Sequence, residues 1–98
     1  MITHVITLKM KDGSPEHIAH CKALLEGMVG KVDSLRSLVV GVNVVDTPNS
    51  HDFVLITTFD DLDGLDAYQH DPAHLEVANY LRANRDASAV VDFEGTIT

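Results

Sequence analysis

The chain has 98 residues and a mass of 10.7 kDa, which is the size of one domain spanning residues 1–98. Apolar residues make up 45% of it and charged residues 22%, a globular composition that excludes an intrinsically disordered chain. Its 7 Lys and Arg against 15 Asp and Glu give a formal net charge of −8. This charge argues against nucleic acid and membrane surfaces as partners, since both attract basic proteins, and against anionic substrates.

The sequence also predicts where the protein is found. No segment has the roughly 20 consecutive apolar residues of a membrane span, and the N-terminus lacks the charged-then-apolar pattern of a leader. The single cysteine, Cys21, cannot form an internal disulfide, which is typical of a reducing compartment. We therefore expect a soluble, cytoplasmic protein, with Cys21 as a small core residue rather than a nucleophile.

The first elements are expected to be a strand and a helix. Residues 3–11 alternate and are rich in β-branched side chains, as in a strand. Ser14 and Pro15 then predict a helix start, with Ser as N-cap and Pro at the first helical position. Gly30 is expected to end this helix. Its apolar face consists of Ile18, Cys21, Leu24, Leu25, Met28 and Val29.

Residues 38–46 and 53–59 predict a second and a third strand, joined by the turn-rich segment 47–52 as a long-looped hairpin. Their side chains, like those of the first strand, are apolar on both faces. In a sheet with one solvated face, that face is polar. Something is therefore expected to cover the second face.

Two helices are expected after the third strand. Asp60 and Asp61 can cap a short one, and Asp71 with Pro72 predicts the start of the next, with Asp as N-cap and Pro at the first helical position. The inward residues are Leu62, Leu65 and Tyr68 in the short helix, and Leu75, Ala78 and Leu81 in the next.

The last strand is expected at residues 89–97. The order is then β-α-β-β-α-β, the ferredoxin-like or split βαβ arrangement, which is an α+β fold with four antiparallel strands and helices on one face. The chain has no further segment to cover the other face, which carries Val5, Val39 and Val45. We therefore expect a homodimer joined through these sheet faces; the alternative is that β-branched residues merely reflect strand propensity.

Three side chains form a candidate catalytic site. His4 lies on the apolar face of the first strand, Tyr68 ends the apolar face of the short helix, and His74 is the third helical residue after Asp71. The positive end of the helix dipole favours a neutral imidazole at His74, although the Asp71 carboxylate opposes this. A neutral His74 can act as general base while the Tyr68 hydroxyl holds a carbonyl oxygen. The alternative is that the three residues are unrelated and only line the edge of the core.

The other histidines carry weaker signals. His17 and His20 have the i, i+3 spacing of metal ligands, but no third ligand joins them, so we expect a solvated pair. His51 lies in a turn, where a polar residue is ordinary. We expect neither a metal site nor a cofactor.

The segment YQHDPAH, residues 68–74, follows a strand that ends in Thr-Thr-Phe and resembles the signature of the stress-responsive α/β-barrel (Dabb) domain. Residues 4–11 resemble the first strand of that family. The resemblance covers essentially the whole chain and implies a homodimer whose two sheets face each other to form a barrel, with helices outside. The family includes plant stress proteins and a plant polyketide cyclase, whose catalytic Tyr–His pair maps onto Tyr68 and His74 and whose first-strand pocket histidine maps onto His4.

The chain departs from the cyclase pattern at one position. Phe53 stands where the cyclase has a further pocket histidine, and His51 lies two residues earlier. At a rise of about 3.4 Å per strand residue, this would displace the side chain by about 7 Å while keeping it on the same face.

Three functions follow from these residues and the resemblance. The first is a dimeric stress-associated barrel that binds a small apolar or carbonyl compound without assigned chemistry. The second is an acid–base enzyme of polyketide-cyclase type that acts on an enolisable carbonyl substrate. The third is a cofactor-independent or haem-degrading monooxygenase, which ranks last because aromatic residues are 5% of the chain and Trp is absent.

Overall fold

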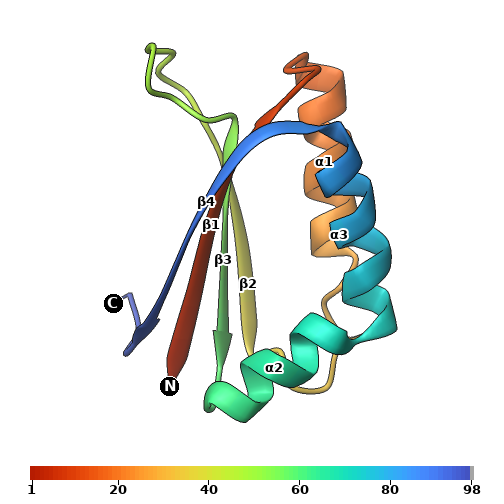
Figure 1. The fold of residues 1–98 in the computed structure, drawn as a ribbon, viewed down its shortest axis with the longest axis vertical. Helices are drawn as coiled ribbons and strands as arrows, with labels where there is room; N and C mark the ends of the chain where they lie inside the picture. The colour runs from red at the N-terminus through yellow and green to blue at the C-terminus, as the bar shows by residue number, and fades with distance from the viewer. Residues whose placement is uncertain (98) are drawn as a thin grey trace.

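The structure, a computed structural model, describes residues 1–97. Its four strands form one antiparallel sheet in the order β2-β3-β1-β4, and its helices pack on one face of that sheet (Figure 1). This confirms the α+β ferredoxin-like fold, in which α2 is a short helix before the longer α3. The elements are β1 (Ile2–Met10), α1 (Pro15–Glu26), β2 (Ser37–Val42), β3 (Phe53–Phe59), α2 (Leu62–His70), α3 (Pro72–Asn84) and β4 (Arg85–Glu94).

The predicted helix starts are confirmed, because short polar side chains cap each one. The Ser14 hydroxyl accepts from the backbone N–H of His17 at the start of α1. The Asp61 carboxylate accepts from the N–H of Gly64 in α2 at 2.8 Å. These acceptors satisfy N–H groups that have no partner within a helix, and so they determine where each helix begins.

The second strand is shorter than the predicted 38–46, since β2 ends at Val42. Beyond it, Asn43 N–H still donates to the carbonyl of Asp52 at 2.9 Å, and the chain then leaves the sheet as a loop. This loop projects beyond the sheet (Figure 1), and Val44 on it is 93% exposed. Strand propensity extends through this segment, but no neighbouring strand lies there to pair with it.

Two further bounds were wrong. β4 begins at Arg85 rather than at 89, because α3 runs into it without a loop, and it ends at 94 rather than 97. α1 ends before Gly27, whose N–H donates to carbonyls of the last turn, and Gly30 instead forms a turn at φ +83°. Val29, predicted on the apolar face, is consequently exposed beyond the helix end.

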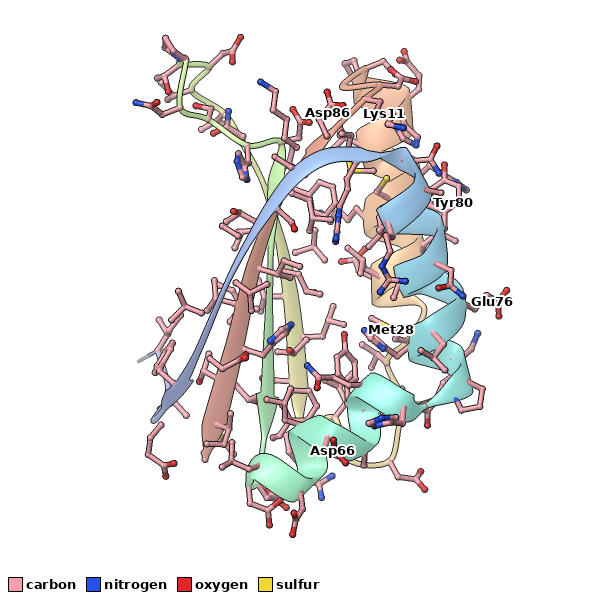
Figure 2. All side chains as sticks on the ribbon, viewed as in Figure 1. Lys11, Met28, Asp66, Glu76, Tyr80 and Asp86 are labelled. Atoms are coloured by element: carbon pink, nitrogen blue, oxygen red, sulfur yellow. The ribbon has the colours of Figure 1, made fainter. Side chains whose placement is uncertain are left out.

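The core lies between the sheet and the helices. Figure 2 shows side chains from both layers filling this space, with Met28 among them, while Glu76 projects outward. Two predicted inward residues, Leu62 and Leu75, are instead exposed. Leu62 is the first residue of α2. Leu75 lies beside the inward face of α3, which consists of His74, Val77, Ala78 and Leu81.

The opposite face of the sheet has no helix over it (Figure 1). Across it runs one row of apolar side chains, in which Val39 of β2 pairs with Ile56 of β3, Ile56 with Val5 of β1, and Val5 with Val91 of β4. Val39 is 57% exposed and Val91 is 62% exposed. Val45, predicted on this face, lies in the loop after β2 instead. None of the helices within residues 1–97 is long and apolar enough to cross a membrane.

Candidate ligand and acid–base site

The fold brings His4, Tyr68 and His74 together on the helix side of the sheet. His4 is buried on β1, Tyr68 is buried on α2, and His74 lies half-buried in the first turn of α3. The ring centroids of Tyr68 and His74 are 4.2 Å apart, and those of His4 and Tyr68 are 6.4 Å apart. Three elements distant in sequence therefore supply adjacent polar rings.

These rings line a cavity of ≈ 60 Å³ between the sheet and the helices. Apart from Arg85 at the start of β4, the rest of the lining is apolar. At the share of about 30 Å³ that each molecule has in liquid water, the cavity has room for about two water molecules. Four larger hollows among the described residues are open surface grooves, none of them lined by Tyr68 or His74. Those of ≈ 460 and ≈ 360 Å³ lie beside the loop between β2 and β3, one of ≈ 400 Å³ lies on the uncovered sheet face, and one of ≈ 320 Å³ lies at the start of α2.

His74 is held in its neutral form. Burial lowers the pKa of its imidazole, and the nearby ring of His4 and the Arg82 guanidinium lower it further. The Gln69 carbonyl and the Asp71 carboxylate pull this pKa the other way. Nδ1 of His74 is buried without a hydrogen-bond partner among residues 1–97. The lowered pKa of His74 has the direction expected from the sequence, but its main cause is burial of the ring rather than the helix dipole.

The Tyr68 hydroxyl is a proton donor that the chain itself leaves unused. Burial raises the pKa of this phenol far above its ordinary value, so it stays protonated at neutral pH. No hydrogen bond joins the hydroxyl to another of the described residues, and the ring packs against Phe59 at a centroid distance of 5.0 Å. Tyr68, with its protonated hydroxyl, and His74, with its unpartnered Nδ1, thus line one cavity.

Sequence reasoning missed two residues of this site. Asp92 on β4 stands directly opposite His4 on β1, and its carboxylate accepts a hydrogen bond from Nδ1 of that ring. A carboxylate in this position fixes the ring's orientation and leaves Nε2 as the free nitrogen. The sequence does show Asp92 as a charged residue within an apolar strand. Its position opposite His4, however, follows only from the register of β1 with β4. Arg85 was the other omission, because its strand was predicted to begin four residues later.

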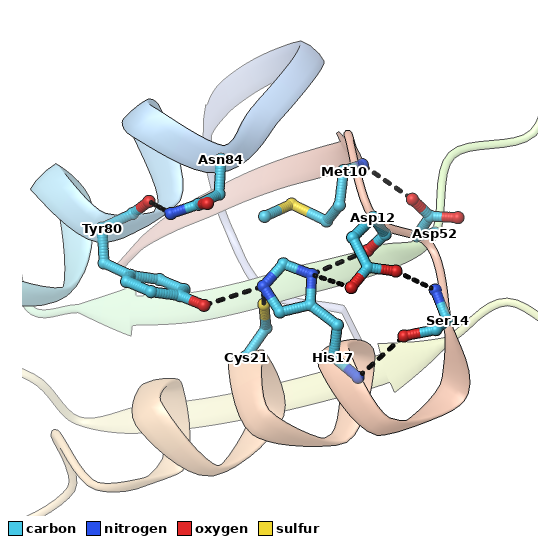
Figure 3. Close-up of polar contacts among 8 residues, drawn as sticks. All are labelled: Met10, Asp12, Ser14, His17, Cys21, Asp52, Tyr80 and Asn84. Carbon is cyan, nitrogen blue, oxygen red and sulfur yellow. Dashed lines mark hydrogen bonds and ion pairs between the residues drawn. The ribbon is translucent and has the colours of Figure 1, made fainter.

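His17 lies outside this site, and its predicted solvated state was wrong. Its ring bridges α1 to α3, accepting from the Tyr80 hydroxyl at 2.8 Å and donating from Nδ1 to the Asp12 carbonyl at 2.7 Å (Figure 3). Packing of α1 against α3 removes the ring from water. Neighbouring His20 is exposed, and Cys21 is a buried core residue whose thiol pKa is raised by that burial. Within residues 1–97, no group of three or more His, Cys, Asp and Glu could hold a metal ion.

His51 does not reach the cavity, and the expectation that it shares a face with Phe53 was wrong. Phe53 is buried on the helix side, whereas Nδ1 of His51 lies 2.9 Å from Oγ1 of Thr7, which points to the uncovered face. The strand begins only at Phe53, so strand parity does not extend back to His51. The site therefore holds two histidines.

The antiparallel sheet, with helices on one face and a small cavity beneath them, defines a ferredoxin-like α+β protein. More particularly, the chain belongs to the family of the stress-responsive A/B barrel domain (Dabb), whose model matches residues 2–95. This confirms the family resemblance seen in the sequence.

Individual relatives agree with this assignment. The chain is 32% identical over 78 residues to an uncharacterised protein of Streptomyces coelicolor, covering 76% of this chain and 79% of the relative. A solved structure from Bacteroides fragilis is 25% identical, with a TM-score of 0.80 and coverage of 96% and 95%. Another, from a Jannaschia species, is 27% identical, with a TM-score of 0.78 and coverage of 96% and 98%. Both are described as dimeric ferredoxin-like proteins of unknown function.

Proposed function

We propose that this chain is a homodimeric barrel protein that binds a small carbonyl compound in the cavity between sheet and helices. The observation that carries the proposal is the adjacency of Tyr68 and His74 at the cavity, where Nδ1 of His74 is buried without a hydrogen-bond partner among residues 1–97. A buried polar group without a partner costs about 1–3 kcal/mol. A ligand carbonyl oxygen beside the two rings would accept a hydrogen bond from the Tyr68 hydroxyl, and from Nδ1 of His74 in the tautomer that carries the proton there.

The uncovered sheet face supports the dimer. Three rows of side chains cross all four strands on this face, through Thr3, Val5 and Thr7 of β1. None of the twelve residues in these rows is charged, although the chain contains 15 Asp and Glu. Burying such a face against a second copy removes apolar surface from water and desolvates no charge. Relatives described as dimeric support the pairing of two copies.

Acid–base chemistry on an enolisable carbonyl is a second candidate, favoured by the lowered pKa of His74. The unprotonated imidazole would take a proton from the carbon beside the carbonyl. The Tyr68 hydroxyl would donate a hydrogen bond to the carbonyl oxygen as negative charge develops there. The Asp92 carboxylate would orient the imidazole ring of His4, whose centroid lies 6.4 Å from that of Tyr68.

The size of the cavity limits the ligand. Pockets for drug-sized molecules are about 300–1,000 Å³, far above the ≈ 60 Å³ found here. A cavity of about 150 Å³ holds benzene, so the present side-chain positions admit about two or three non-hydrogen atoms, and a four-carbon compound already requires some widening. A polyketide-sized substrate would need the cavity to widen.

Binding is tested by an NMR titration with butanone, following the ring signals of Tyr68 and His74. We expect these signals to shift together and the exposed His70 ring to stay unchanged. The same samples in D₂O report on chemistry through exchange of the butanone α-protons, with Tyr68→Phe and His74→Ala as variants and His70→Ala as the matched control. Unchanged ring signals at high butanone concentration would refute the ligand site. Binding without faster exchange would leave binding as the function and remove the enzyme.

A further inference from the structure

Arg85 is the only Lys, Arg, Asp or Glu among the described residues that line the cavity. It ends α3 and begins β4, where it pairs with Met10, a residue buried on the helix side of β1. Side chains of paired strand positions point to the same face. The Arg85 side chain therefore extends toward the helices, into the layer that holds His4, Tyr68 and His74.

The guanidinium of Arg85 has no protein partner among residues 1–97. The other two arginines do: Arg36 pairs with Asp60 at 3.0 Å, and Arg82 donates to Asn79 at 3.0 Å. Arg85 is only partly exposed. A charged group in an apolar setting without a partner is unfavourable, and the planar guanidinium matches a carboxylate through two parallel hydrogen bonds.

Building on the proposed ligand site, we infer that Arg85 forms a carboxylate-binding end of this cavity, so that the ligand is a small oxo-carboxylate. His74 and Arg85 lie about three helical turns apart along α3, yet both line one cavity of ≈ 60 Å³. The ligand's carbonyl lies at Tyr68 and His74, and its carboxylate at Arg85.

The net charge of −8 argues for neutral ligands when the chain is considered as a whole. At physiological salt, however, charges on the outer surface are screened beyond about 8 Å. Inside the cavity the nearest charges decide: among the described residues the lining holds the Arg85 guanidinium, while the Asp92 carboxylate lies outside the lining and is hydrogen-bonded to His4. The positive charge of Arg85 therefore favours an anionic ligand in the cavity, although the negative net charge of the whole chain does not.

The test compares acetoacetate with acetoacetamide, two ligands that differ only by an amide nitrogen in place of a carboxylate oxygen. Affinities are measured by NMR titration on the Tyr68 and His74 ring signals. We expect wild-type protein to bind acetoacetate about tenfold or more tightly than acetoacetamide. Arg85→Gln removes this preference while holding acetoacetamide affinity within about twofold, and Arg85→Lys keeps part of it. Lys31→Gln, which removes an equal charge from the exposed segment after α1, retains the full preference.

Equal affinity of the two ligands for wild-type protein would overturn the carboxylate-binding end and leave the ligand site standing. The absence of any shift with either ligand would refute the ligand site together with this inference. If Arg85→Gln does not fold, as judged by its circular dichroism, the wild-type comparison and Arg85→Lys decide the question.

Discussion

The ring of Tyr68 lies against that of His74 at a centroid distance of 4.2 Å and an angle of 43°, although the two residues belong to different helices. Asp71 produces this arrangement, because it ends α2 and begins α3. Its N–H donates to the Tyr68 carbonyl at 3.2 Å, and its carboxylate accepts from the N–H of Ala73 at 2.8 Å. One residue thus sets the turn that aligns the two rings.

Replacing Asp71 should therefore destabilise the protein. Asp71→Ala removes the side-chain cap of α3 and is expected to cost about 1 kcal/mol. Pro72→Ala should be mild, because that position has no helical N–H partner to lose. Urea midpoints of the two variants measure this order. A larger loss for Pro72→Ala than for Asp71→Ala would contradict the role assigned to the cap.

The titration of His74 should make stability depend on pH. Its pKa is lower in the folded protein than the ordinary value of 6.5, so the unfolded chain binds more protons in that range. Wild-type stability relative to His74→Gln is expected to fall as the pH drops from about 6.5 through the folded-state pKa. Urea unfolding at pH 7.5 and 5.5 measures this difference. An NMR pKa above 6.5 for His74 would reverse the expected sign, and one above about 7.5 would remove the general-base role.

A carboxylate on the uncovered sheet face should prevent dimer formation. Val91→Asp puts a charge in the apolar row that crosses the sheet, and desolvating it would be costly. Val90→Asp is the matched control, because Val90 is 50% exposed on the other face of the same strand. In sedimentation equilibrium at micromolar concentration, we expect twice 10.7 kDa for wild type and Val90→Asp. Val91→Asp should sediment as a monomer; a wild-type monomer would refute the dimer.

The hydrogen bond between His4 and Asp92 should determine the tautomer of His4. With the carboxylate accepting from Nδ1, neutral His4 is expected to carry its proton on Nδ1. Long-range ¹H–¹⁵N correlation spectra distinguish the two tautomers. Asp92→Leu should shift the population toward the Nε2–H form, while His74 keeps its tautomer. An Nε2–H form of His4 in wild-type protein would exclude the hydrogen bond.

Local signals in the sequence were sufficient for much of the fold. Ser14, Asp61 and Asp71 mark helix starts because a short polar side chain satisfies N–H groups only a few residues away. Strand alternation likewise placed His4 on the face of β1 that packs against the helices. Such features depend on neighbours within one or two turns, and therefore appear in the sequence itself.

Only the tertiary structure decided the rest, because each remaining feature depends on a partner far along the chain. The end of β2 depends on how far β3 runs beside it, and burial of His17 depends on Tyr80 from another helix. Asp92 belongs to the site because the register of β4 with β1 places it opposite His4. A shift of one residue in that register would turn the Asp92 side chain to the opposite face of the sheet. By itself the sequence determined the helix starts, the strand faces and the family. Pairing register and helix packing decided which polar groups were buried together, since both join residues that are distant in the sequence.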